Sequence, residues 1–292
     1  MRVTQSMVYR NFLSDLSSLN ESSDKVLREI SSGKKLISIR DSPSGSARLV
    51  SISDLESKID QYTSNAGDSS YFLQAADSAL NEVNNLVTSI YTRGSQAGTE
   101  TIGEEERAVL AQEVRALRDQ ILTLANSQAR GRYIFAGSLV TDAPFTIAGD
   151  TVSYGGNDVV NSVLVDKATE VEQGASGSEA FSDVFGAIED LLVAMDGNNI
   201  ADIQNALGQF SDALTGLGRV RAKIGTNIGL LENIQSNLAT SKISLTEQRS
   251  RIEDADLAES VVELNRIQTS LEAAISAGSS LLGTRNLFDI IG

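Results

Sequence analysis

The sequence predicts a mainly α-helical fold: an elongated antiparallel helical bundle or coiled-coil rod with paired N- and C-terminal helices and a small β-rich insertion. Apolar residues recur at steps of three and four along most of the 292-residue chain. Only 5% of the residues are aromatic and none is Trp, so we expect a core of narrow aliphatic seams between helices. The spacing changes toward a period of two only between residues 132 and 173, which indicates short strands.

The first helix is predicted to begin near Gln5 and to end at about Ser31. One apolar stripe runs along it, broken only at Ser23, and consists of Tyr9, Phe12, Leu16, Leu19, Val26 and Ile30. Gly33 follows as a typical helix stop. An isolated stripe of this kind needs a partner helix, because its apolar side chains must be covered.

The last helix supplies such a partner. Its stripe repeats at steps of four and three, or their sum, and consists of Leu257, Val261, Leu264, Leu271, Ile275 and Leu282. The two ends also differ in charge, since residues 1–40 hold 7 Lys and Arg against 4 Asp and Glu, whereas residues 253–292 hold 2 against 7. The sequence therefore predicts that the two termini pair.

A long seam follows the N-terminal region. Its apolar spacing predicts one helix from about Ser46 to Thr92, which at 1.5 Å per residue would be roughly 70 Å long. The next stretch is predicted to be a loop containing Gly94, Gly98 and Gly103. Thr101 ahead of Glu104 is expected to cap a helix that continues to about Ala129.

The β-rich insertion comes next. Four short pieces separated by Gly, Asn, Asp and Pro are predicted to be strands, namely 133–135, 145–147, 151–154 and 159–165. About forty residues make a marginal core, so we expect the insertion to lean on the helices or on a neighbouring subunit.

Helical spacing resumes at Phe181 and, after a break at 196–199, continues in a second long seam to Ile252. Polar side chains occupy four positions in this seam and are expected to face a groove or a subunit contact: Arg221, Gln235, Lys242 and Arg249. The pattern as a whole predicts three domains. Residues 1–44 and 253–292 form a terminal helical domain, 45–131 and 181–252 a long-helix domain, and 132–180 a small β-rich domain.

Composition excludes several functions. A net charge of −15 disfavours nucleic acid as a partner, because a phosphate backbone requires a basic face. The chain has neither Cys nor His, the side chains most often used in metal sites and general-base chemistry. The sequence has no apolar run that would make a secretory signal or a membrane span, which favours a cytoplasmic protein unless a dedicated channel exports it.

Two clusters of side chains resemble parts of chemical sites. Gly33, Lys34 and Lys35 resemble part of a phosphate-binding loop, but neither the upstream glycine nor the preceding strand is present, which favours a basic connector. Paired carboxylates of a glycosidase would have to come from Glu253, Asp254, Asp256 and Glu259. Residues two apart point to different faces of a helix, and acids favour a helix start, so we predict no catalytic, cofactor or metal residues.

Two separated, ordered motifs carry a family resemblance. The run LSSLNESSDKVLREISSGKKLISIRDSPSG at 16–45 and the run SRIEDADLAE at 250–259 resemble the paired terminal signatures of the bacterial flagellin superfamily. Within it, the start MRVTQSM, the run GRYIFAGS at 131–138, TDAPF at 141–145 and the following Tyr154, Gly155 and Gly156 resemble the hook-filament junction proteins. The resemblance covers essentially the whole chain.

The resemblance implies a structural role. Both termini would form an inner helical layer, in which the two terminal stripes are the assembly interface. The chain would leave the cytoplasm through the flagellar type III apparatus, join copies of itself in a ring or helical layer, and connect a hook-side junction protein to flagellin outside the cell. Two other functions remain open: flagellin itself, and a coiled-coil tip protein of another secretion system.

The resemblance also implies an export chaperone that binds the C-terminal helix in the cytoplasm. The last twelve residues are the most apolar end of the chain, and their candidate contact residues are Leu281, Leu282, Leu287, Phe288, Ile290 and Ile291. Such a tail invites aggregation when exposed, so we expect the chaperone to cover the surface that later enters the filament layer.

Overall fold

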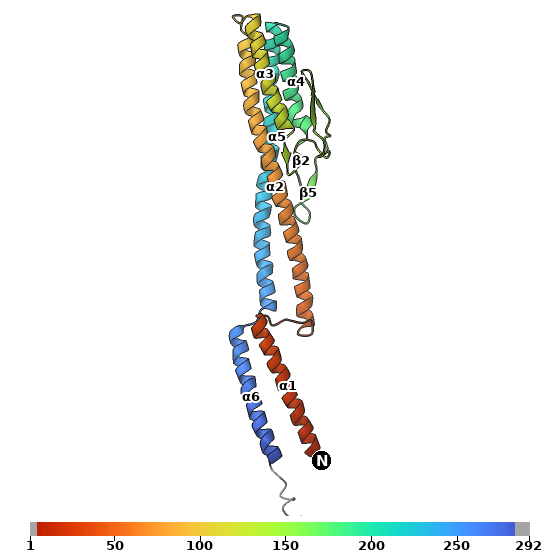
Figure 1. Ribbon diagram of the computed structural model, residues 1–292, viewed down its shortest axis with the longest axis vertical. Coiled ribbons are helices and arrows are strands. Elements are labelled where there is room, and N and C mark those ends of the chain that lie inside the picture. Colours follow the sequence, from red (N-terminus) through yellow and green to blue (C-terminus); the bar gives the residue numbers. More distant parts are fainter. Residues whose placement is uncertain (1–4, 284–292) are drawn as a thin grey trace, which may run out of the picture. The chain divides into compact units, whose positions relative to one another are not determined.

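A computed structural model describes residues 5–283 of the chain, and it confirms the mainly helical fold class (Figure 1). The helices of this part are α1 (Gln5–Ser32), α2 (Pro43–Ala97), α3 (Glu104–Ala125), α4 (Gly177–Asp196), α5 (Ile200–Glu253) and α6 (Leu257–Gly283). They divide into two compact units, one of Met1–Lys58 with Ser241–Gly292 and one of Ile59–Thr240. The three-domain division stays a prediction.

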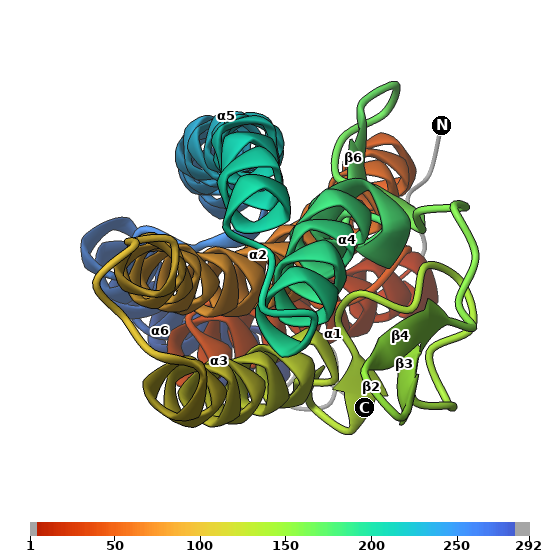
Figure 2. The same ribbon diagram turned by 90° about the horizontal axis from the view of Figure 1, so that it is seen from above.

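The unit Ile59–Thr240 packs α3 and α4 beside the long helices α2 and α5 (Figure 2). Its core is aliphatic, as the low aromatic content predicts, and includes the fully buried Leu73, Leu80, Ile90, Leu191 and Leu217. Ser69 is also fully buried in the α2 seam, where its hydroxyl donates to the Asn65 carbonyl at 2.8 Å. Arg221 of the α5 seam pairs with Asp77 at 3.0 Å, so its charge is used within the unit.

Gly94 lies inside α2, so the prediction of a loop at this glycine is wrong. A Cβ there would come within 2.8 Å of Leu207 and 2.9 Å of Leu191. Gly94 therefore permits a close approach of α2 to α4 and α5 rather than ending the helix.

The predicted cap at Thr101 is also wrong, because Gly103 is the N-cap of α3 and its amide donates to Glu106 Oε2 at 3.4 Å. Buried Arg107 then donates to the Ala97 carbonyl at 2.8 Å and so caps the end of α2.

The β insertion consists of three separate antiparallel pairs. They are β1 (Gln128–Ala129) with β2 (Arg132–Tyr133), β3 (Phe145–Ala148) with β4 (Thr151–Tyr154), and β5 (Ser162–Leu164) with β6 (Glu170–Glu172). Its Phe135 and Phe145 pack against Phe181 and Phe185 of α4. The ring centroids of Phe135, Phe145 and Phe185 lie within 6.0 Å of the Phe181 centroid. The insertion therefore leans on the helices of its own chain, one of the two supports expected for it.

The turn between β3 and β4 is tied to α3 by a carboxylate shared between two arginines. Asp150 accepts from Arg118 Nη1 at 2.6 Å and from Arg115 Nη2 at 2.9 Å. Arg115 also pairs with Asp196 at the end of α4. The two guanidinium groups, Arg115 first, hold the pKa of Asp150 below its ordinary value.

Candidate assembly surface

The two sequence signatures meet in the unit of Met1–Lys58 and Ser241–Gly292. Gly33 ends α1 with a φ of +69°, a conformation that glycine adopts without strain. The Ala255 amide donates to the Gly33 carbonyl at 2.9 Å, and the Lys35 amide donates to the Glu253 carbonyl at 2.8 Å. These bonds make an isolated antiparallel bridge between Lys34 and Asp254. We call residues 33–35 with 253–255 the clasp, because it joins segments that are far apart in sequence.

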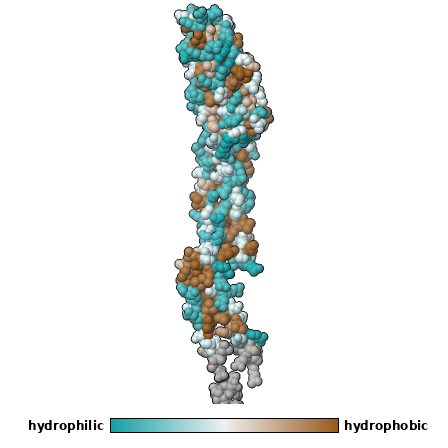
Figure 3. All heavy atoms as spheres, in the orientation of Figure 1, coloured by the Kyte–Doolittle hydropathy of each residue, from teal (hydrophilic) through white to brown (hydrophobic). Residues whose placement is uncertain are grey.

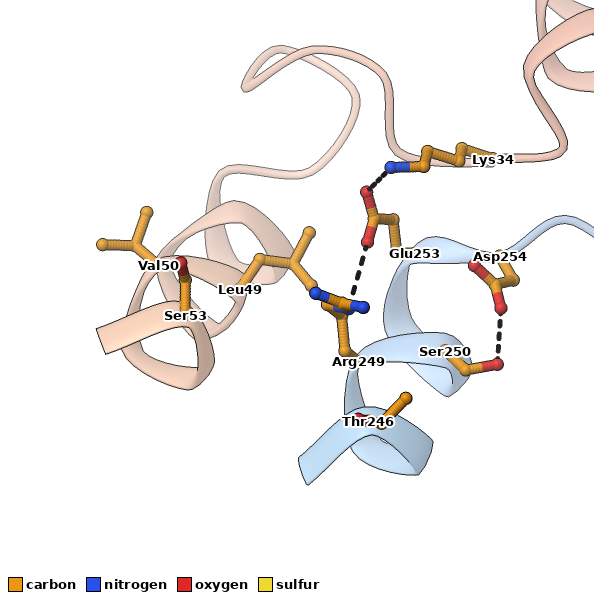
Figure 4. A pocket seen from close by; sticks show the side chains of 9 residues that line it. All are labelled: Lys34, Leu49, Val50, Ser53, Thr246, Arg249, Ser250, Glu253 and Asp254. Carbon is orange, nitrogen blue, oxygen red and sulfur yellow. Dashed lines mark hydrogen bonds and ion pairs between the residues drawn. The ribbon is translucent and has the colours of Figure 1, made fainter. Parts of the chain in front are cut away.

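Side chains reinforce the clasp (Figure 4). Lys34 Nζ lies 2.5 Å from Glu253 Oε1, a contact between residues 219 positions apart. Arg249 Nη1 lies 3.0 Å from Glu56 Oε2, which links α5 to α2. Lys35 Nζ donates to the Arg251 carbonyl at the end of α5, at 2.9 Å. Both lysines thus bind their own chain.

The four carboxylates that a glycosidase pair would require lie at the clasp and at the start of α6. Glu253 pairs with Lys34, and Asp254 accepts from the Ser250 hydroxyl at 2.5 Å. Asp256 accepts from the Ala258 and Glu259 amides at 2.9 and 3.2 Å and so caps the start of α6. The geometry therefore gives three of the four a structural bond.

Helices α1 and α6 pack against each other and run antiparallel (Figure 1). Each presents an inward row of buried or half-buried residues with the spacing 4-3-4-3-4. The α1 row is Phe12, Leu16, Leu19, Ser23, Val26 and Ile30, and the α6 row is Ser260, Leu264, Ile267, Leu271, Ala274 and Gly278. Gly278 fits under the Phe12 ring, because a Cβ there would lie 2.9 Å from Phe12 Cε1. These rows form a coiled-coil-like seam between the termini.

The predicted terminal stripes coincide only partly with these rows. Five of the six α1 residues lie on the α1 row, whereas Tyr9 is 48% exposed. On α6 only Leu264 and Leu271 lie on the row. The side chain of Leu282 lies outside the described residues. The sequence interpretation missed Ser260, Ile267, Ala274 and Gly278, because three of these four are small or polar. The unbroken 4-3 spacing was the signal that could have found them.

The remaining predicted α6 residues belong to a second surface. Leu257, Val261 and Ile275 are 51%, 46% and 58% exposed, and on α1 the same holds for Tyr9, Leu13 and Leu27 at 48%, 44% and 47%. At about 100° per residue, both sets lie on the same rotational side of their inward rows. Because the helices are antiparallel, that places both sets on one side of the pair. We call these six residues the open face, and Figure 3 shows apolar surface over this part of the chain.

Two family matches decide the family. Residues 3–139 match the bacterial flagellin N-terminal helical region, and residues 207–287 match the bacterial flagellin C-terminal helical region. The chain belongs to the bacterial flagellin family. Both parts of the clasp lie within these matched regions, so the clasp is built from the family's terminal regions.

Relatives that match most of the chain carry two different names. The flagellin-family chain is 24% identical to the flagellar hook-associated protein 3 of Escherichia coli K12, over 97% of this chain and 98% of that protein. It is also 25% identical to a flagellin of Bacillus subtilis, over 91% of either chain.

Solved structures support the fold alone, because their sequence identity is low. A hook-associated protein described as putative, from Vibrio parahaemolyticus, is 20% identical with a TM-score of 0.68, over 73% of this chain and 100% of that one. The flagellar hook-associated protein-3 of Legionella pneumophila is 13% identical with a TM-score of 0.63, over 69% and 98%. Within residues 5–283, no helix is long and apolar enough to cross a membrane.

Proposed function

We propose that this chain is the structural adaptor that joins the flagellar hook region to the flagellin filament and templates filament growth. The similarity to the hook-associated protein 3 of Escherichia coli, which spans nearly both chains, carries the proposal. The candidate site agrees with a structural role, because it consists of helix-packing surfaces and structural ion pairs.

The open face is the proposed assembly interface. Six large apolar side chains, each about half exposed, leave one side of the α1/α6 pair uncovered. Clustered exposed apolar residues are typical of protein interaction sites. A helix of a neighbouring copy would cover them, while the inward rows hold the pair together. In a ring or helical layer, every copy offers and receives such a contact.

The proposed partners follow the position of a junction. Copies of this chain contact one another, a hook-side junction protein contacts one end of the layer, and flagellin contacts the other. The proposed location is the bacterial flagellum outside the cell, after export by the type III apparatus and a transient stay in the cytoplasm.

Deleting the gene tests the junction role. Cells that lack the chain should carry hooks without filaments and shed flagellin into the medium, as seen by electron microscopy and immunoblotting. Normal filaments on such cells would rule the proposal out.

A second candidate, flagellin itself, is favoured by the similarity to the Bacillus subtilis protein. Immunogold labelling separates the two functions. A junction adaptor labels one short zone at the hook end, whereas a filament subunit labels the filament along its length.

The chaperone proposal rests on the apolar tail. Leu281 and Leu282 lie at the end of α6 with side chains outside the described residues, and residues 284–292, with Leu287, Phe288, Ile290 and Ile291, lie outside the described part of the chain. We expect deletion of residues 281–292 to abolish both capture by the cytoplasmic export chaperone and assembly. The measurement is a pull-down with the purified chaperone, and undiminished affinity of the truncated chain would contradict the idea that both partners share this surface.

A further inference from the structure

The unit that contains the clasp has a second concave surface, formed by the start of α2 and the end of α5. It is a 610 Å³ groove whose lining includes Arg48, Ile52, Arg251 and Ile252. Ile52 is buried and Ile252 half-buried, whereas both arginines are exposed. None of the described residues that line the groove is acidic. An apolar floor between two cations is therefore presented to the surroundings.

The two guanidinium groups have no carboxylate partner among the described residues. The neighbouring cations do: Lys34 and Arg249 pair with Glu253 and Glu56, respectively. Arg251 lies in the last turn of α5, where a positive charge suits the helix dipole. Arg48 lies in the second turn of α2, near the end where a positive charge gains nothing from that dipole. Its charge is thus free for an external anion.

Helix α6 of the same chain carries an exposed surface that pairs an acidic side chain with an apolar one. Glu259 and Val262 stand three residues apart at the start of α6, so they share one side of that helix. Val262 is 68% exposed, which exceeds the exposure of Leu257, Val261 and Ile275 on the same helix. Glu259 is exposed and has no ion-pair partner among the described side chains. This side points away from both the inward row and the open face.

We propose that the Arg48–Arg251 groove binds the first two turns of α6 from a second copy of the chain. Val262 packs on the floor of Ile52 and Ile252, and the Glu259 carboxylate lies between the two guanidinium groups. Charge complementarity selects this occupant, because the described part of α6 has three glutamates and one arginine, Arg266, which is already paired with Glu263. The contact is head-to-tail, so it propagates from copy to copy.

The inference rests on the proposed function in one respect, that copies of this chain assemble. The absence of cysteine from the chain allows a clean trapping experiment. A strain without the native gene would produce two variants together, Ser51→Cys in the groove and Val262→Cys on α6. Because each copy has one cysteine, a disulfide between unlike copies joins position 51 of one copy to position 262 of the other. Ser270→Cys, exposed on α6 about two turns beyond Val262 and off the open face, replaces Val262→Cys as the matched control.

Mild oxidation of isolated flagella should yield the Ser51→Cys/Val262→Cys dimer and no dimer with the control. Arg48→Glu with Arg251→Glu should abolish the dimer, and Glu259→Lys on the other copy should restore it. Arg219→Glu, an exposed reversal elsewhere on α5, should leave the dimer unchanged.

Three results overturn the inference. Normal flagella without the cross-link would refute the contact while leaving the junction role intact. Gln248→Cys, on the other wall of the groove, then replaces Ser51→Cys to check that result. A cross-link from the groove to another flagellar protein would assign a different occupant. Equal cross-linking of the control would refute a contact that is specific for the Glu259–Val262 side of α6.

Discussion

Leu264 and Val261 allow the two surfaces of α6 to be tested separately. They stand three residues apart, but Leu264 lies on the inward row, half-buried against α1, and Val261 lies on the open face and is 46% exposed. Aspartate at either position places a carboxylate in an apolar surface. We expect both variants to lose assembly and only Leu264→Asp to disturb the monomer.

The magnitude follows from burial. Half-burial of a leucine contributes about 1 kcal/mol, and an unpaired carboxylate facing the α1 row adds about 1–3 kcal/mol. A total of about 2–4 kcal/mol is large for a pair of single helices, so α1 and α6 should separate. Val261→Asp should change monomer stability by less than about 0.5 kcal/mol, because its side chain is already in water.

Circular dichroism and hydrogen exchange measure the difference. Leu264→Asp should lower the helical signal toward the loss of α1 and α6, which have 28 and 27 residues, and should increase exchange of α1 amides. Val261→Asp should leave both unchanged. Ala273→Asp, exposed on α6 away from both surfaces, is the control and should assemble. Normal assembly of Val261→Asp would refute the open face as a contact, and unchanged α1 exchange in Leu264→Asp would refute the inward row.

Three further predictions concern the fold that supports this surface. Asp150→Asn should lower the free energy of unfolding by about 2 kcal/mol at neutral pH, measured by thermal unfolding, with exposed Asp142→Asn as the control. Because the folded-state pKa of Asp150 is lowered, its contribution is complete above the ordinary value of 3.8, and the difference between variant and wild type should shrink as the pH falls below it. Phe181→Ala should lower the free energy of unfolding in urea by about 3–5 kcal/mol, since its ring is fully buried; a loss below about 1 kcal/mol would mean that the aromatic cluster adds little. Gly33→Val should weaken the clasp by about 1–2 kcal/mol, because a β-branched residue resists positive φ, whereas Gly33→Asn should weaken it less; equal exchange of the Ala255 amide in both variants would contradict this.

The sequence predicted helices well because their signal is local and repetitive. A stripe such as Phe12, Leu16 and Leu19 has one periodic explanation, and the structure places all three on the α1 row. The fold class and the regions of the long helices could be predicted for the same reason. Glycines could not be assigned in this way, because Gly94 serves a contact with Leu191 and Leu207 that only tertiary structure reveals.

The candidate site was predictable in its location but not in its geometry. Hydrophobicity alone favoured Leu257, Val261 and Ile275 as the partners of α1, whereas the pairing uses Ser260, Ala274 and Gly278 beside the larger residues. Small side chains permit the close approach, and the larger ones remain for the open face. The hydrogen bonds of the clasp carry no sequence period, so periodicity could not have found them.

The clasp also constrains the order of folding. Its two segments are separated by most of the chain, so closing that loop in an unfolded chain costs roughly 5 kcal/mol of entropy. Packing within the unit Ile59–Thr240, including the Arg221–Asp77 pair between α5 and α2, shortens the free chain that must close. The terminal pair should therefore be the last structure to form. Helix α1 is synthesised before α6 and stays unpaired until α6 is made. During that interval its apolar row has no partner within its own chain, so the newly made protein is most exposed to unwanted association before its C-terminal helix is complete.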